Sequence, residues 1–153
     1  MTSTSTRDFA HRLLAKYYLP AIQECLHDGF VVALVGNPGS GKSLLASHAL
    51  PTATLIGGMQ RDTVLAAEIN TDIIGDDLFH VVPADFIRLR DAAMARGHRV
   101  LITGHIWNDV SPYLQGLAED RYRVLDLNSV WSCPTYQPIP EVVLFDPVMV
   151  AQA

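Results

Sequence analysis

The chain has 153 residues, 49% of them apolar and 18% charged, and its formal charge at neutral pH is −5. Such a composition is typical of a folded, core-forming chain, and the length predicts one α/β domain without a separate substrate domain. The acidic balance, with only two lysines, excludes a globally basic nucleic-acid-binding surface and leaves room only for a local arginine patch.

No targeting or membrane segment is expected from the sequence. Residues 2–6 form a polar Ser/Thr tail instead of a signal peptide, and no apolar run approaches the ~20 residues that span a bilayer. Cys25 and Cys133 lack metal-ligand spacing, so buried free thiols are expected, with a single disulfide as the alternative. These features predict a cytoplasmic protein.

Residues 7–28 carry apolar side chains at close to helical spacing, and Gly29 is a natural stop. Pro20 lies inside this pattern, so we expect a first helix to about Tyr18 and a short second helix with Pro20 in its first turn. We expect these helices to cover the sheet, with a partner-binding arm as the alternative.

The segment GFVVALVGNPGSGKS, which starts at Gly29, combines a strand-like run with a glycine-rich turn. Gly36 and Gly41 bracket four residues before Lys42 and Ser43, the spacing of a loop whose backbone N–H groups wrap a phosphate. Glycine permits positive φ and close approach, and the following helix directs its positive end at the anion. The expected nucleotide-binding residues are Gly36, Asn37, Pro38, Gly39, Ser40, Gly41, Lys42, Ser43 and Leu44.

On these residues the chain resembles the P-loop NTPase superfamily. The resemblance implies a three-layer α/β/α fold with a mainly parallel sheet, ATP and Mg²⁺ as ligands, Lys42 on the β- and γ-phosphates, and Ser43 on Mg²⁺. No Asn-Lys-x-Asp guanine motif occurs in the chain, so ATP is favoured over GTP.

Strands and helices alternate through the rest of the core, which favours right-handed βαβ crossovers, a parallel sheet and a ligand at the carboxyl ends of the strands. Pro51 should end the helix after the glycine-rich loop. The further elements expected are strands at 52–56, 71–78, 98–106 and 122–127, helices at 60–69, 83–95 and about 111–119, and a strand candidate at 142–145. Asn108 or Asp109 should cap the helix near residue 111.

The segment Ile73-Ile74-Gly75-Asp76-Asp77 resembles a Walker B element, an apolar strand that ends in an acidic pair. By that resemblance Asp76 coordinates Mg²⁺ and Asp77 takes the place of the water-polarising glutamate. Gly75 departs from the pattern, in which a third aliphatic residue is usual. The alternative is a solvated acidic turn.

The strand around Arg99-Val-Leu-Ile-Thr-Gly-His105 stands where a RecA-like or AAA+ core has its sensor strand, between the P-loop and Walker B strands. The resemblance implies that Thr103 or His105 touches the γ-phosphate or the attacking water. A histidine near a strand end with ordinary hydrogen bonds is the alternative for His105.

Residues 92–127 also resemble part of the P-loop kinases of the polynucleotide-kinase and zeta-toxin type. There Arg61 and Asp62 would lie near the acceptor hydroxyl, with Asp62 as general base. Two features argue against this reading: no arginine follows between Asn128 and Pro140, and the strand ends in Gly104-His105 instead of an Asp.

We therefore expect a minimal RecA-like or AAA+ ATPase core at residues 30–127, within a single domain that has a tail at 1–6, a helical cover at 7–28 and a Pro-rich extension at 128–153. Lys42, Asp77, Thr103 and His105 are the catalytic candidates, and Ser43 and Asp76 the metal ligands. A motor, switch or loader role on DNA or a protein is expected, with a small kinase and a nucleotide-binding structural protein as alternatives. Candidates for an arginine finger, acting in a homo-oligomer, are Arg61, Arg121 and Arg123.

Overall fold

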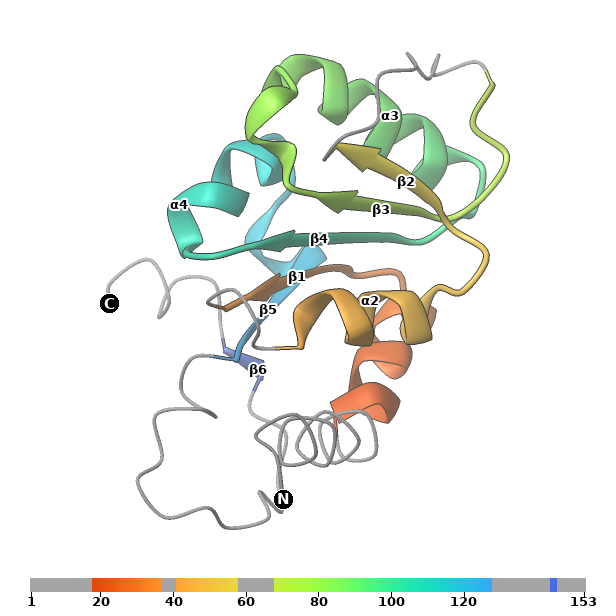
Figure 1. The fold of residues 1–153 in the computed structure, drawn as a ribbon. Helices are drawn as coiled ribbons and strands as arrows, with labels where there is room; N and C mark the ends of the chain where they lie inside the picture. Colours follow the sequence, from red (N-terminus) through yellow and green to blue (C-terminus); the bar gives the residue numbers. More distant parts are fainter. Residues whose placement is uncertain (1–17, 37–40, 58–67, 128–143, 146–153) are drawn as a thin grey trace, which may run out of the picture.

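The computed structural model describes residues 18–36, 41–57, 68–127 and 144–145 and shows an α/β fold (Figure 1). A helix at 18–27 precedes the first strand. The further elements are β1 Val31–Val35, α2 Lys42–Ala49, β2 Thr54–Gly57, β3 Ile73–Asp76, a 3₁₀ helix Leu78–His80, α3 Pro83–Ala95, β4 Val100–Gly104, α4 Trp107–Val110, 3₁₀ helices Ser111–Leu114 and Glu119–Arg121, β5 Tyr122–Asp126 and β6 Leu144–Phe145.

The strands form one sheet in the order β2-β3-β4-β1-β5-β6. The first five are parallel, and β6 pairs antiparallel with β5. The last residue of β1, Val35, lies beside Gly104 on β4 and Asp126 on β5, so these three strands end at one edge of the sheet. The expected insertion of the 98–106 strand between the strands at Phe30 and Thr71 is confirmed, because β4 pairs with both β1 and β3.

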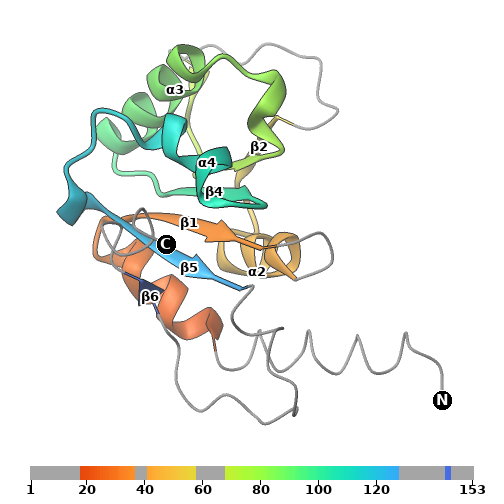
Figure 2. The same cartoon turned by 90° about the vertical axis from the view of Figure 1, so that its left-hand side faces the viewer.

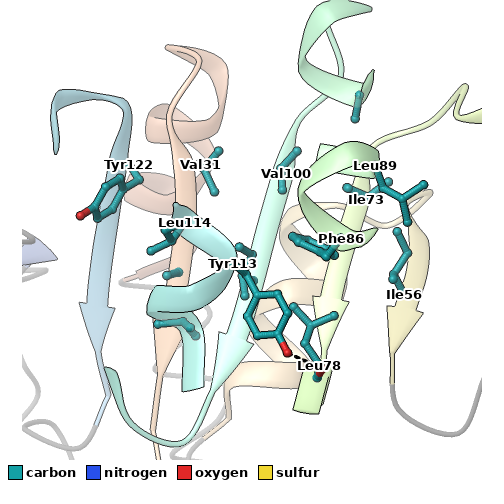
Figure 3. Close-up of a cluster of buried hydrophobic side chains, with 14 of the residues drawn as sticks. Val31, Ile56, Ile73, Leu78, Phe86, Leu89, Val100, Tyr113, Leu114 and Tyr122 are labelled. Atoms are coloured by element: carbon teal, nitrogen blue, oxygen red, sulfur yellow. Dashed lines mark hydrogen bonds between the residues drawn. The ribbon is translucent and has the colours of Figure 1, made fainter. Parts of the chain in front are cut away.

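Helices pack on both faces of the sheet, which explains why the central strands are continuous apolar runs. Every residue of β1 and of β4 is buried, as expected for parallel strands covered on both sides. Val32 and Leu34 face the cluster formed with α2 and the 18–27 helix, whereas Val31 and Ala33 face the cluster formed with α3 and α4. Figure 2 shows these helices on opposite sides of the sheet, and Figure 3 shows the α3 cluster.

Several expected elements are confirmed. The helix Pro83–Ala95 begins and ends where the sequence indicates, with Pro83 in its first turn and Gly97 at φ 79° just after its end. Likewise α2 ends before Pro51. Residues 18–27 form one helix that includes Pro20. The helix expected before Tyr18 and most of the one expected at 60–69 lie outside the described residues.

The helix expected at about 111–119 is wrong. The chain instead forms α4 at Trp107–Val110 and a 3₁₀ helix at Ser111–Leu114. Asp109 does act as a cap, but its carboxylate binds the N–H of Ile106, so the helix starts earlier than expected. Pro112 provides no N–H, and Gly116 has φ 85°, so an α-helix cannot continue through this stretch.

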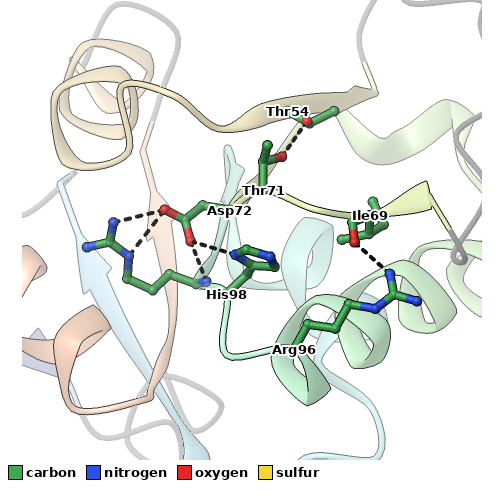
Figure 4. Close-up of polar contacts among 7 residues, drawn as sticks. Thr54, Ile69, Thr71, Asp72, Arg96 and His98 are labelled. Carbon is green, nitrogen blue, oxygen red and sulfur yellow. Dashed lines mark hydrogen bonds and ion pairs between the residues drawn. The ribbon is translucent and has the colours of Figure 1, made fainter.

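Polar contacts tie the strands together at their amino ends (Figure 4). Asp72 accepts hydrogen bonds from the Arg99 backbone N–H at 2.7 Å and from Arg99 Nη2 at 2.9 Å. The hydroxyls of Thr54 and Thr71 lie 2.6 Å apart. These contacts hold the starts of β2, β3 and β4 in register at the edge opposite the carboxyl ends.

No helix among the described residues is long and apolar enough to cross a membrane. Cys25 is a free, partly buried thiol, whereas Cys133 lies outside the described residues.

Candidate functional site

The glycine-rich loop joins the end of β1 to the start of α2. At the β1 side, the Gly36 N–H donates to the Gly104 carbonyl at 3.0 Å, which extends the pairing of β1 with β4 past the strand ends. At the α2 side, Gly41 is the N-cap at φ 95° and ψ 7°, a conformation that suits glycine. The described ends of the loop therefore join the carboxyl end of β1 to the first turn of α2. Asn37, Pro38, Gly39 and Ser40 lie outside the described residues.

Lys42, the first residue of α2, is only 7% exposed. Burial lowers the pKa of its ammonium, and the carboxylates of Asp76, Asp77 and Asp109 act against that shift by raising the pKa. These carboxylates come from the end of β3, the residue after it, and α4, so Lys42 is within electrostatic reach of acids from separate parts of the chain. A buried cation among acids at the strand ends is a typical setting for binding a phosphate together with a metal ion.

Asp76 is the last residue of β3, and its Oδ1 accepts a short hydrogen bond from the Thr103 hydroxyl. Thr103 lies on the neighbouring β4 and is only 2% exposed. The structure thus brings together two predicted site residues from strands separated by 27 positions in the sequence. Thr103 holds the Asp76 carboxylate, a contact that the sequence did not predict.

Asp77 is exposed and has φ 50° and ψ 54°. It is the only residue other than glycine with positive φ among those the structure describes. Asp tolerates this left-handed conformation better than most residues, but at a cost of about 1 kcal/mol or more. The conformation ends β3 abruptly and turns the chain into the 3₁₀ helix Leu78–His80.

His105 follows β4 directly and is exposed. Its backbone N–H donates to Asp109 Oδ2 at 3.0 Å, and within the described part of the chain its ring has no hydrogen-bond partner. The histidine therefore lies at the predicted edge and is held through its main chain. The sequence predicted Asp109 only as a helix cap. Its carboxylate also raises the pKa of Lys42, an effect that the sequence signals for a helix start do not indicate.

Gly75, the departure from the Walker B pattern, is explained by packing. A Cβ at this position would lie 2.7 Å from Leu78 Cδ1 and 2.9 Å from Phe86 Cε2. Because Gly75 has no side chain, the fully buried Phe86 ring of α3 can pack directly against β3.

The two arginine-finger candidates that the structure describes lie away from this edge. Arg121 and Arg123 flank the start of β5, at the amino end of the sheet, and Arg123 stacks over the Phe30 ring at 4.1 Å. Arg61 lies outside the described residues, as does Asp62, the base of the kinase alternative.

The oxygen donors present fit a magnesium ion that is shared with a phosphate. Asp76 keeps one carboxylate oxygen beyond the one that binds Thr103, and Ser43 is exposed in the first turn of α2. Across the described ranges no group of three or more His, Cys, Asp or Glu could hold a metal ion. Mg²⁺ in nucleotide sites uses one or two protein oxygens, with phosphate and water as the other ligands, so this donor set suits it.

No family model matches the chain, and neither a curated protein nor a solved structure gives a match.

Proposed function

We propose that the chain is a P-loop NTPase of the RecA-like or AAA+ broad class that binds ATP with Mg²⁺ and hydrolyses it. One observation carries the proposal. The Asp76 carboxylate on β3, the Thr103 hydroxyl on β4 and the buried Lys42 after β1 converge at one edge of a parallel sheet in which β4 separates β1 from β3. Ligands of open parallel sheets bind at this edge.

Each residue has a role in this proposal. The N–H groups at the start of α2 hold the polyphosphate, and Lys42 stabilises the charge that develops on the γ-phosphate. Asp76 and Ser43 would hold Mg²⁺, which neutralises phosphate charge when bound. Thr103 donates to Asp76 Oδ1 and leaves the second carboxylate oxygen as the one that would bind the metal.

The chemical step is attack of water on the γ-phosphorus. The bond to the β–γ bridging oxygen breaks, the electron pair stays with ADP, and inorganic phosphate and a proton are released. Asp77 accepts a hydrogen bond from the attacking water and orients it. Asp is shorter than the usual glutamate at this place, so its backbone conformation decides how far the carboxylate reaches.

The strand order favours an ATPase over the kinase alternative, because β4 lies between β1 and β3. No described residue specifically supports an acceptor site for a kinase. The energy of hydrolysis would serve a motor, switch or loader role on DNA or a protein, and a homo-oligomer would supply an arginine from a neighbouring subunit.

The test is turnover of [γ-³²P]ATP with Mg²⁺, with and without DNA and hydroxyl acceptors. Release of free phosphate is expected. A labelled acceptor would identify a kinase, and tight ATP binding without any product would indicate a structural nucleotide-binding protein.

Asp77→Asn is the informative variant, because Asn also tolerates the left-handed conformation while it removes the charge. Turnover should fall by roughly 10²- to 10⁴-fold, the range for loss of a catalytic acid–base group, while ATP affinity changes little. Asp120→Asn makes the same change at an exposed position near the amino end of β5 and should leave turnover unaltered. Equal turnover in both variants would remove Asp77 from the mechanism.

A further inference from the structure

The segment Trp107–Leu114, made of α4 and the following 3₁₀ helix, contacts both loops that flank the candidate site. We propose that this segment is a brace that positions Asp77 relative to Thr103, with Tyr113 as its positioning residue. The inference rests on the proposed function and adds to it residues that no motif in the sequence assigns.

One end of the brace holds the loop after β4. Asp109 Oδ2 accepts the N–H of His105 at 3.0 Å and the N–H of Ile106 at 3.2 Å. These two amides directly follow Thr103 and Gly104, so the carboxylate fixes the chain where it leaves β4. Gly104 allows the close approach, since a Cβ there would lie 2.8 Å from Val110 Cγ1 and 2.9 Å from Asp109 Cβ.

The other end holds the turn after β3. The Tyr113 hydroxyl lies 2.5 Å from the Leu78 carbonyl oxygen and 2.9 Å from that of Val81, and it donates its proton between them. Figure 3 shows this ring pointing at the turn from the α4 side of the sheet. Tyr113 is only 5% exposed, and burial raises the pKa of its hydroxyl, so the group remains a donor.

The brace is itself anchored to α3. The buried Arg90 donates from Nη1 to the carbonyls of Tyr113 at 2.9 Å and of Gln115 at 2.8 Å. The Phe86 ring packs edge-on against the Tyr113 ring, with centroids 5.6 Å apart. These contacts hold Tyr113 in place, so it can restrain the turn after β3.

The turn needs such a contact because its first residue is strained. Asp77 stands in the left-handed region, which persists in a non-glycine residue only when the surroundings enforce it. Leu78, the next residue, is buried, and its carbonyl accepts both the Val81 N–H at 2.7 Å and the Tyr113 hydroxyl. Removal of the hydroxyl should let the turn relax and the Asp77 carboxylate move.

Tyr113→Phe tests the brace, because it keeps the ring and removes only the hydroxyl. Tyr18→Phe is the matched control, since Tyr18 is equally buried but packs on the opposite face of the sheet. Amide hydrogen exchange at residues 77–82 should accelerate in Tyr113→Phe alone. Loss of about one hydrogen bond should lower kcat roughly five- to tenfold, with little change in KM.

A double-mutant cycle with Asp77→Asn separates positioning from general destabilisation. If Tyr113 acts through Asp77, Tyr113→Phe should not reduce the residual turnover of Asp77→Asn any further. An equal reduction in both backgrounds would show that Tyr113 has only a structural role and would overturn the inference.

Unchanged exchange at residues 77–82 would also overturn the brace and would leave the proposed function intact. A wild-type protein that neither binds nor hydrolyses ATP would overturn the proposed function and the catalytic part of the inference. The exchange comparison would still decide in that case whether the hydroxyl holds the turn.

Discussion

Lys42 has an environment unlike that of a surface lysine. It is a helix-starting residue with an almost fully buried side chain, and three acids influence its charge. Burial of an ammonium costs free energy unless opposite charges or hydrogen bonds compensate it. Under the proposed function this cation would meet the polyphosphate, and its burial would reduce the stability of the nucleotide-free protein.

That cost predicts how stability depends on pH. Burial holds the pKa of Lys42 below the ordinary lysine value of 10.5, so between the lowered pKa and 10.5 the unfolded chain binds more protons than the folded one. The free energy of unfolding of the nucleotide-free protein therefore rises with pH through that window. Below the window the full free-energy cost of burying the charged ammonium remains. Urea unfolding between pH 7.5 and 10 should show that the free energy of unfolding rises less with pH in Lys42→Met than in wild type. Parallel curves would contradict this.

Thr103 and Asp76 are two predicted site residues that bind each other. The sequence indicated a polar sensor at the end of β4, and in the structure the Thr103 hydroxyl donates to Asp76, the predicted metal ligand. Both residues belong to the predicted site, but the contact between them depends on β3 and β4 being neighbours. Local sequence signals do not contain that information.

At the scale of the elements, packing between β3 and α3 explains the unusual glycine in the acidic segment. Gly75→Ala would put a methyl group against Leu78 and the Phe86 ring, both buried. Overpacking of this kind costs about 1–3 kcal/mol, which urea unfolding should detect. Phe86→Leu removes part of the ring, so the double variant should lose less stability than the two single changes added together. Strict additivity would show that the contact does not restrain Gly75.

Elements with strong local signals were the ones that the sequence predicted well. Pro83 and Gly97 mark the ends of α3, and the β-branched run before Gly36 marks β1, because proline, glycine and valine restrict the backbone within a few residues. The segment after β4 was predicted badly. There a carboxylate cap at Asp109, Pro112 and the positive φ of Gly116 divide the chain into short helices, and their combined effect depends on contacts with α3 and the turn after β3.

At the scale of the whole molecule, the proposed function predicts that ATP stabilises the folded chain. A ligand that binds only the folded state at 100 times its Kd adds about 2.7 kcal/mol. For a chain of this size that corresponds to a rise in Tm of roughly 5–10 °C. Thermal unfolding with Mg²⁺ and ATP should show this rise in wild type and a much smaller one in Lys42→Met. GTP at the same concentration should raise Tm less, and an equal rise would contradict the preference for adenine.

Neighbouring residues in the chain were enough to predict the α/β class, the strand and helix around the glycine-rich loop, the acidic pair and the polar end of the next strand. Each of these features depends on residues that lie close together in the sequence. The resemblance predicted that β4 lies between β1 and β3, and the sheet order confirms it. Only the folded chain showed that Thr103 binds Asp76, that Tyr113 binds the turn after β3 and that Asp109 binds the loop after β4. The physical reason is separation: these contacts join residues as far as 35 positions apart, and the order of strands in the sheet brings them together.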